Sequence, residues 1–416
     1  MRPLIRDAAW VSASHVAAAL TTLGVQVVLA RRLETAVFGA YLLAQSMVNL
    51  VESTLMSRSG EVATYWLGRH WKVDFGTAHA YANYLAKREL RWNLTAAVLL
   101  AIVALVLQPH LGVDWLFIAV LALGIPLQSS YGVSKTLFVV AGRLRQQAAF
   151  EIGYSIVYVS ISLVLVMQYG LWGFVIGYLV ITLLKTVLSA LWVRRFWPEA
   201  ARTRDTVKPP ALGLSTYSVL RNVSVNISQQ ADVIVLGIFA SKEAVALYKI
   251  ARTVASMPAR LAGPVWSVLR PRVLTHLRDG DVRGVRSLLL RPALGLLIIG
   301  VVALPAALLW MDDLLGFVYG AQYVGAGGMA VILLVGVWVL FGLSGWMGFV
   351  AVVTSNKVVA TGLFVLQALA VLIAGFIARD SGVLLAILMS GAMVLIGALA
   401  WMSLHARSPR FALLRL

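Results

Sequence analysis

Two charged residues inside apolar segments are the first candidates for chemistry. Asp232 precedes Lys242 by ten residues and Arg252 follows it by ten, and long apolar runs flank the polar turn at 241–243. At a rise of about 1.5 Å per residue, each would lie roughly 15 Å from the turn, near the middle of a hydrocarbon core about 30 Å thick. An ionised side chain at that depth is costly unless it faces a partner or a wet cavity. The spacing therefore predicts that Asp232 and Arg252 contact each other or share one cavity.

The segment that carries Asp232 also carries a stripe of polar residues. Its members recur every three or four positions: Ser218, Asn222, Asn226, Gln229 and Asp232. Steps of that size keep side chains on one face of an α-helix. The stripe indicates the wall of a substrate cavity. Interhelical hydrogen bonds that only hold a bundle together are the alternative.

Two further carboxylates, Glu52 and Glu151, lie in apolar segments, and Glu52 shares its predicted helix with Gln45 and Asn49. A carboxylate at membrane depth suits a carrier of H+ or Na+, because it can exchange between a charged and a neutral form. We therefore expect Asp232, Glu52 and Glu151 to couple transport to an ion. For Glu52 the alternative is a salt bridge to a local base such as Arg58.

The sequence contains no motif that is typical of an enzyme active site. The chain has no cysteine, and His15 has no second His, Cys or carboxylate at ligand spacing, so a metal site is not expected. There is no Walker motif, dinucleotide glycine fingerprint, HExxH helix or Ser/His/Asp set. We expect no enzyme activity and no cofactor, and transport would have to run on a gradient.

Composition places the chain in the membrane. Hydrophobic residues make up 60% and charged residues 12% of its 416 positions, with a mean hydropathy of +0.87, which is far from the profile of a soluble domain. The net charge of +18 comes from basic residues scattered in short clusters between apolar runs. That distribution does not form a nucleic-acid-binding surface and is instead typical of membrane topology.

The apolar runs predict an all-α protein with twelve transmembrane helices. Their approximate spans are 8–30, 38–56, 92–108, 114–138, 147–168, 171–193, 213–239, 244–268, 289–310, 325–350, 358–378 and 382–404. With the N-terminus in the cytoplasm, the predicted cytoplasmic segments hold 26 basic residues and the outer segments 4. This bias predicts a multi-pass protein with both termini cytoplasmic.

The polar stretch 194–212, which contains Pro209-Pro210, divides the chain into two halves, 1–193 and 213–416. A weak internal match, in which Tyr41 corresponds to Tyr248 at a shift of 207 residues, supports this division. Six helices per half predict two six-helix bundles related by a pseudo-twofold axis along the membrane normal, with a binding site between them.

Several segments resemble a known family. The opening LARRLETAVFGAYLLAQSMVNL is similar to the start of bacterial polysaccharide flippases, the O-antigen and exopolysaccharide members of the multidrug, oligosaccharidyl-lipid and polysaccharide exporter superfamily. The segments ADVIVLGIFASKEAVALYKIARTVASMP and GFVYGAQYVGAGGMAVILLVG resemble signatures of that family's second half. Glu34 and Thr35 depart from the Gly-Pro that the family often has after its first helix.

This resemblance implies a flippase in the bacterial inner membrane. Its cargo would be an oligosaccharide on undecaprenyl diphosphate, moved to the outer leaflet for O-antigen, lipopolysaccharide or exopolysaccharide synthesis. A polysaccharide polymerase and glycosyltransferases would be its partners. Arginine binds phosphate oxygens bidentately. The residues expected to bind the substrate are Arg252, Arg31, Arg32, Arg58, Tyr248, Gln45, Asn49, Asn222, Asn226 and Gln229.

Two other functions remain open from the sequence. A multidrug exporter of the same superfamily would favour an acidic cavity for cationic cargo, whereas arginine makes up 27 of the 35 basic residues and these outnumber 17 acidic ones. A membrane-embedded polysaccharide polymerase would need a large outer loop or an acidic metal-binding pair, and neither is visible.

Overall fold

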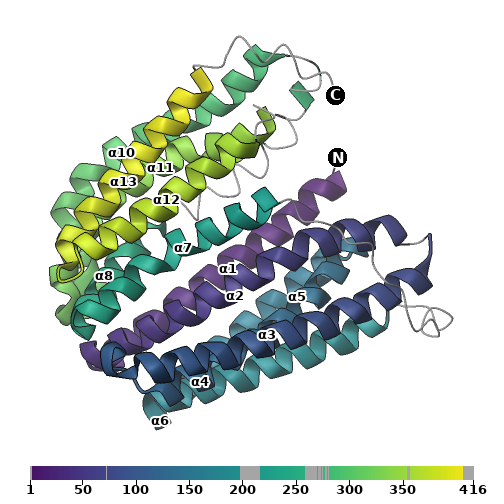
Figure 1. The fold of residues 1–416 in the computed structure, drawn as a ribbon, viewed down its shortest axis with the longest axis horizontal. Helices are drawn as coiled ribbons and strands as arrows, with labels where there is room; N and C mark the ends of the chain where they lie inside the picture. The colour runs from purple at the N-terminus through teal and green to yellow at the C-terminus, as the bar shows by residue number, and fades with distance from the viewer. Residues whose placement is uncertain are drawn as a thin grey trace. The chain divides into compact units, whose positions relative to one another are not determined.

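The computed structural model describes residues 2–71, 73–196, 216–257, 281–353 and 357–405, together with Leu269, Val273, Thr275, His276 and Asp279. This described part of the chain consists of helices and contains no strand (Figure 1). The first set is α1 (Arg2–Arg32), α2 (Thr35–His70), α3 (Phe75–Leu111), α4 (Trp115–Ala122), α5 (Gly124–Val140) and α6 (Leu144–Arg194). The second set is α7 (Thr216–Phe239), α8 (Lys242–Ala255), α10 (Val282–Tyr319), the 3-10 helix η2 (Ala321–Ala326), α11 (Gly327–Val353), α12 (Lys357–Ile377) and α13 (Gly382–His405).

Each of the twelve predicted spans coincides with a helix or with one part of a helix, and the predicted all-α fold class is confirmed. α4 and α5 follow each other within one span, and α6 is interrupted at Gly170, where the backbone has φ 61° and ψ −143°. Within the described residues, six stretches are long and apolar enough to cross a membrane: Phe75–Leu111, Trp115–Val140, Leu144–Arg194, Ser287–Tyr319, Ala321–Leu340 and Gly382–Ala400. The chain is a multi-pass membrane protein.

The helices extend beyond the apolar runs. The basic segment 57–91, which lies between the predicted spans 38–56 and 92–108, is mostly helical, because α2 continues to His70 and α3 already begins at Phe75. Asp74 caps the start of α3, since its carboxylate accepts hydrogen bonds from the backbone N–H and the hydroxyl of Thr77 at 3.1 and 2.6 Å. Hydropathy detects only the part of a helix that suits hydrocarbon, which is why the prediction missed these polar ends.

The first compact unit comprises Met1–Glu34 and Ala44–Leu214. In it α6 packs against α1 and α5, and α3 packs against α4 and α5. At one end, buried side chains from four helices form an apolar cluster: Leu67, Ala78, Tyr81, Ala82, Leu85, Leu137, Phe138, Val193 and Phe196. Apart from residues 194–196, the predicted linker 194–212 lies outside the described residues.

The second unit comprises Thr35–Leu43 and Ser215–Leu416, so it includes the first turns of α2. In it α11 packs against α8, α10 and α13, and α12 packs against α7 and α13. A side chain at Gly39 would collide with the backbone carbonyl of Lys242, so glycine permits the start of α2 to approach the start of α8. At the shift of 207 residues that the weak sequence match suggests, Gly39 corresponds to Ala246, and these two positions lie close together inside this unit.

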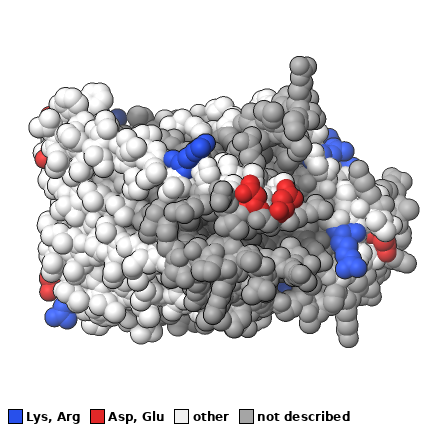
Figure 2. Space-filling model, turned by 90° about the horizontal axis from the view of Figure 1, so that it is seen from above, with Lys and Arg blue, Asp and Glu red and all other residues white. Residues whose placement is uncertain are grey.

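Apolar side chains cover much of the described surface. Val301 and Val302 on α10 are each 72% exposed, and Phe317 is 79% exposed. Figure 2 shows a face on which charged side chains are few among the described residues. In water such a surface would aggregate, whereas against lipid tails it costs nothing, so these faces are suited to contact the bilayer.

Candidate functional site

The α7–α8 hairpin brings Asp232, Tyr248 and Arg252 together. The Tyr248 hydroxyl donates a hydrogen bond to Asp232 Oδ2 at 2.6 Å, and Arg252 Nη1 forms an ion pair with Asp232 Oδ1. Arg252 Nη2 donates to the backbone carbonyl of Ser228 at 2.9 Å. Asp232 is fully buried and the Arg252 side chain is 14% exposed. The predicted contact between the two charged residues is therefore present.

The turn between the two helices sets this register. The Ser241 hydroxyl caps α8 by accepting the Ala244 N–H at 3.3 Å, and Lys242 Nζ donates to the Gly237 carbonyl at 2.5 Å at the end of α7. Because Asp232 and Arg252 are equally distant from Lys242 in sequence, an antiparallel hairpin places them level. Each charge then compensates the other in a buried position.

The rest of the polar stripe on α7 is only partly buried. Asn226 is 7% exposed, and its Nδ2 has no hydrogen-bond partner among the described residues. Asn222 is half-buried and Gln229 is exposed, while the neighbouring Gln230 accepts a hydrogen bond from Lys249 Nζ at 3.2 Å. The side chain of Ser218 lies outside the described residues.

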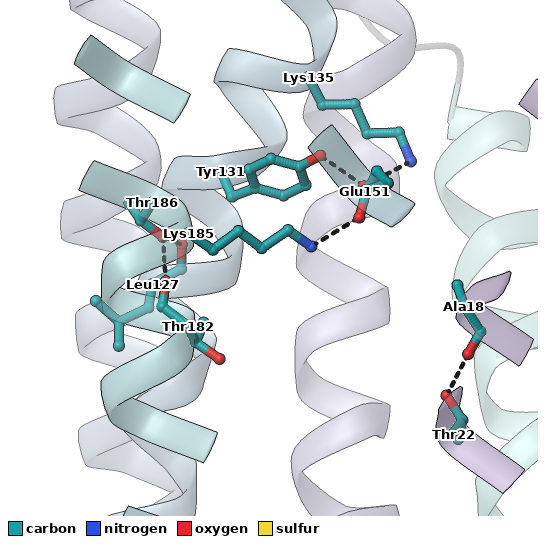
Figure 3. Close-up of polar contacts among 9 residues, drawn as sticks. All are labelled: Ala18, Thr22, Leu127, Tyr131, Lys135, Glu151, Thr182, Lys185 and Thr186. Carbon is teal, nitrogen blue, oxygen red and sulfur yellow. Dashed lines mark hydrogen bonds and ion pairs between the residues drawn. The ribbon is translucent and has the colours of Figure 1, made fainter. Parts of the chain in front are cut away.

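A second charged cluster lies in the first unit, around Glu151 and Lys185 (Figure 3). Lys185 Nζ is 3.1 Å from Glu151 Oε2, and the Tyr131 hydroxyl donates to Glu151 Oε1 at 2.5 Å. Lys135 Nζ approaches the same Oε1 at 4.0 Å. The Lys185 ammonium also lies 3.9 Å from the ring centroid of Tyr131 and 4.1 Å from that of Tyr154, within cation–π range.

The interruption of α6 creates this cluster. Gly170 adopts a positive φ that L side chains rarely adopt, and there the chain turns back on itself. The ring centroid of Tyr158, in the arm before Gly170, lies 6.4 Å from that of Phe174 and 6.5 Å from that of Tyr178, both in the arm after it. The two arms of α6 therefore run side by side. Residues from the two arms, such as Glu151 and Lys185, can therefore meet although they are distant in sequence.

The other predicted site residues of the first half are spread along α1 and α2. Gln45, Asn49 and Glu52 are half-buried, and Arg31 and Arg32 are exposed at the end of α1. The side chains of Arg58 and His15 lie outside the described residues.

Glu52 is connected to the second cluster. Among the described residues it interacts electrostatically with Lys185, which thus faces two carboxylates, Glu151 in contact and Glu52 through space. In the described residues, no group of three or more His, Cys, Asp or Glu could hold a metal ion.

Sequence reasoning missed Lys185, Tyr131 and Lys135. The sequence feature that indicated Asp232 also applies to Lys185, because Lys185 is an ionisable residue inside an apolar span and must face a partner. What could not be read from the sequence was its partner, because the pairing depends on the reversal at Gly170 and on which helix faces meet.

A family profile described as polysaccharide biosynthesis protein matches residues 88–326, more than half of the chain. The chain belongs to this family. Glu151, Lys185, Asp232 and Arg252 all lie within the matched range. Among curated proteins, no sequence matches the chain.

Solved structures show the fold of this family member. An inward-facing multidrug resistance MATE family transporter of the MOP superfamily aligns with a TM-score of 0.70 at 14% identity, covering 96% of each chain. The lipid II flippase MurJ, in an inward closed conformation, aligns with a TM-score of 0.67 at 13% identity, covering 95% of this chain and 87% of MurJ. The eukaryotic MATE transporter AtDTX14 aligns with a TM-score of 0.60 at 14% identity, and the alignment covers 96% of this chain and 95% of AtDTX14.

At these identities the likeness establishes the fold alone, which this chain shares with the MATE transporters and with MurJ. The resemblance seen in the sequence motifs is thereby confirmed at two levels, a polysaccharide family and a MOP fold.

Proposed function

We propose that the protein is a flippase that moves an undecaprenyl-diphosphate-linked oligosaccharide from the inner to the outer leaflet of the bacterial cytoplasmic membrane. The observation that carries this proposal is the match to a polysaccharide biosynthesis family in a chain that has a transporter fold over nearly its whole length. The lipid tail of such a cargo can stay in the bilayer, whereas its sugars and diphosphate must be shielded from hydrocarbon. Polar groups inside the helical units serve that need.

The ion-coupling residues in this proposal are Asp232, Glu52 and Glu151, and the ion is H+ or Na+. Glu52 supports it best, because it is half-buried and interacts electrostatically with Lys185. A change in the charge of Glu52 would alter the field at Lys185. Alternating access would then be driven by an ion gradient, since the chain shows no nucleotide motif.

The substrate-binding residues in this proposal are Arg252, Arg31, Arg32, Arg58, Tyr248, Gln45, Asn49, Asn222, Asn226 and Gln229. Asn226 is supported by its buried Nδ2, which has no partner among the described residues and can donate to a sugar hydroxyl. Arg252 would reach a diphosphate only in a state in which its pair with Asp232 opens, because both its terminal nitrogens are engaged.

A genetic experiment tests the proposal in the producing bacterium. Removal of the chain should abolish surface polysaccharide and cause the lipid-linked oligosaccharide to accumulate in the inner leaflet, as measured by extraction and mass spectrometry. Plasmid-borne wild type should restore export. A matched control is Arg379→Gln, which removes an exposed ion pair with Asp380 at 3.5 Å and should restore export equally.

The same strain separates this function from drug export. A multidrug exporter would leave the lipid-linked oligosaccharide at its normal level and would lower resistance to cationic dyes. Unchanged surface polysaccharide in the deletion strain would contradict the flippase.

A further inference from the structure

Among the described residues, the Asp232–Arg252 and Glu151–Lys185 ion pairs differ in how completely their atoms are engaged. Both carboxylate oxygens of Asp232 are bonded, one to Tyr248 and one to Arg252, and the other terminal nitrogen of Arg252 is held by the Ser228 carbonyl. Asp232 is fully buried. If either residue turned to another partner, a buried charge would be left uncompensated, which is costly. The Asp232–Arg252 pair therefore leaves no charged group available to a ligand.

Glu151, in contrast, has more partners than one ion pair needs. Besides Lys185 at 3.1 Å it accepts a hydrogen bond from Tyr131 at 2.5 Å and has Lys135 at 4.0 Å. If Lys185 were withdrawn, the hydroxyl and the second ammonium would still compensate the carboxylate. Lys135 is 45% exposed, whereas Glu151 is 15% and Lys185 7% exposed, so Lys135 is the part of the cluster that lies at the surface of its unit. Glu151 therefore keeps two partners when Lys185 contacts another anion.

Lys185 keeps much of its support when Glu151 is exchanged. Its ammonium stays between the rings of Tyr131 and Tyr154, which attract a cation through their faces. An ammonium has three N–H donors, and its salt bridge to Glu151 runs to one oxygen, Oε2. The ammonium is therefore held in place for an incoming oxyanion.

We propose that Lys185 binds an anionic oxygen of the transported lipid-linked glycan and that the Glu151 carboxylate occupies this position in the absence of cargo. This inference rests on the proposed function, and it identifies Lys185 as the residue that contacts the anionic oxygen of the cargo. The sequence led us to expect that contact on arginines such as Arg252, whereas the contacts in the structure favour the Glu151–Lys185 pair over the Asp232–Arg252 pair.

Two parts of the cargo could supply the anionic oxygen, the lipid diphosphate and a carboxylate on an acidic sugar. Both present the same oxyanion chemistry to an ammonium. Two probes distinguish them: undecaprenyl diphosphate without sugar, and an alkyl glucuronide compared with the neutral alkyl glucoside.

Binding of these probes to the full-length chain in lipid nanodiscs, measured by thermophoresis, tests the inference. Lys185→Met should weaken binding of one anionic probe by about tenfold or more, because a charge-assisted contact is lost. Glu151→Gln should strengthen it, since the competing internal anion is removed. Lys249→Met is the matched control, a half-buried lysine in α8 bonded to Gln230, and should change binding by less than about twofold.

The double variant Lys185→Met with Glu151→Gln guards against misfolding, because it leaves no uncompensated carboxylate. It should fold as wild type does and bind as weakly as the single Lys185 variant. If only diphosphate binding is lost, Lys185 contacts the lipid diphosphate. If only glucuronide binding is lost, Lys185 contacts the carboxylate of an acidic sugar.

Unchanged binding of both probes by the Lys185 variants would overturn the inference, as would weaker binding by Glu151→Gln. If wild type flips lipid-linked glycan while the Lys185 variants keep their affinity, only the inference fails. If wild type neither binds nor flips it, the proposed function fails as well.

Discussion

Asp232 and Arg252 are each costly in a membrane helix and stable as a pair, because each supplies the charge that the other lacks. Their equal distance from Lys242 in the sequence was sufficient to predict this contact. The hydrogen bonds from Tyr248 and to the Ser228 carbonyl were not predictable, since they depend on rotamers and on the rotation of α7.

Arg252→Ala should destabilise the protein by about 3–5 kcal/mol, because it leaves Asp232 buried and uncompensated. Adding Asp232→Asn should recover most of that loss. Thermal unfolding in detergent measures both. Arg379→Ala, which removes an exposed arginine, should cost less than about 1 kcal/mol. A double variant no more stable than the single one would show that the pair is not the source of the effect.

Glu52→Gln should abolish the dependence of transport on an H+ or Na+ gradient, because the amide keeps the shape of the side chain but cannot exchange a charge. Transport into vesicles with and without an imposed gradient measures this. Normal transport with its ion dependence retained would place coupling elsewhere.

Among the helices, α6 is the element on which the Lys185 cluster depends. The sequence predicted two spans separated near residue 170, and the structure shows the reversal at Gly170. Apolar run length is enough to find such a break, because a single span cannot hold 51 residues. It does not tell which faces of the two arms meet, so the pairing of Lys185 with Glu151 required the structure.

Gly170→Ala should cost about 1–3 kcal/mol, because alanine is strained at a φ of 61° with a ψ of −143°. It should also weaken cargo binding by shifting the two arms. Gly153→Ala in the same helix is the control, since added atoms there meet nothing within 4 Å, and it should be neutral or slightly stabilising. Equal unfolding temperatures for both variants would contradict this role of Gly170.

The chain as a whole forms two units, with α2 beginning in the second and continuing in the first. The sequence predicted two halves from the linker and the internal repeat. It gave no reason to group residues 35–43 with the second half, where Gly39 approaches the backbone of Lys242 closely. Shape complementarity between helix starts is not visible in hydropathy.

The predicted topology has both termini in the cytoplasm. Reporter fusions at Lys242 and Asp380 should read outside and fusions at Thr206 and Leu416 inside, because of the bias in basic residues. A fusion at Leu416 that reads outside would contradict it.

The central claim is that this chain moves a lipid-linked glycan across a bilayer, and reconstitution tests it most directly. The full-length protein is inserted into vesicles carrying an undecaprenyl-diphosphate-linked oligosaccharide, and a membrane-impermeant glycosidase added outside measures exposure of inner-leaflet glycan. Wild type is expected to expose nearly all of the glycan when a gradient is imposed, whereas Lys185→Met exposes it slowly. Glycan exposure by wild type that is no faster than in protein-free vesicles would contradict transport of a lipid-linked glycan by this chain.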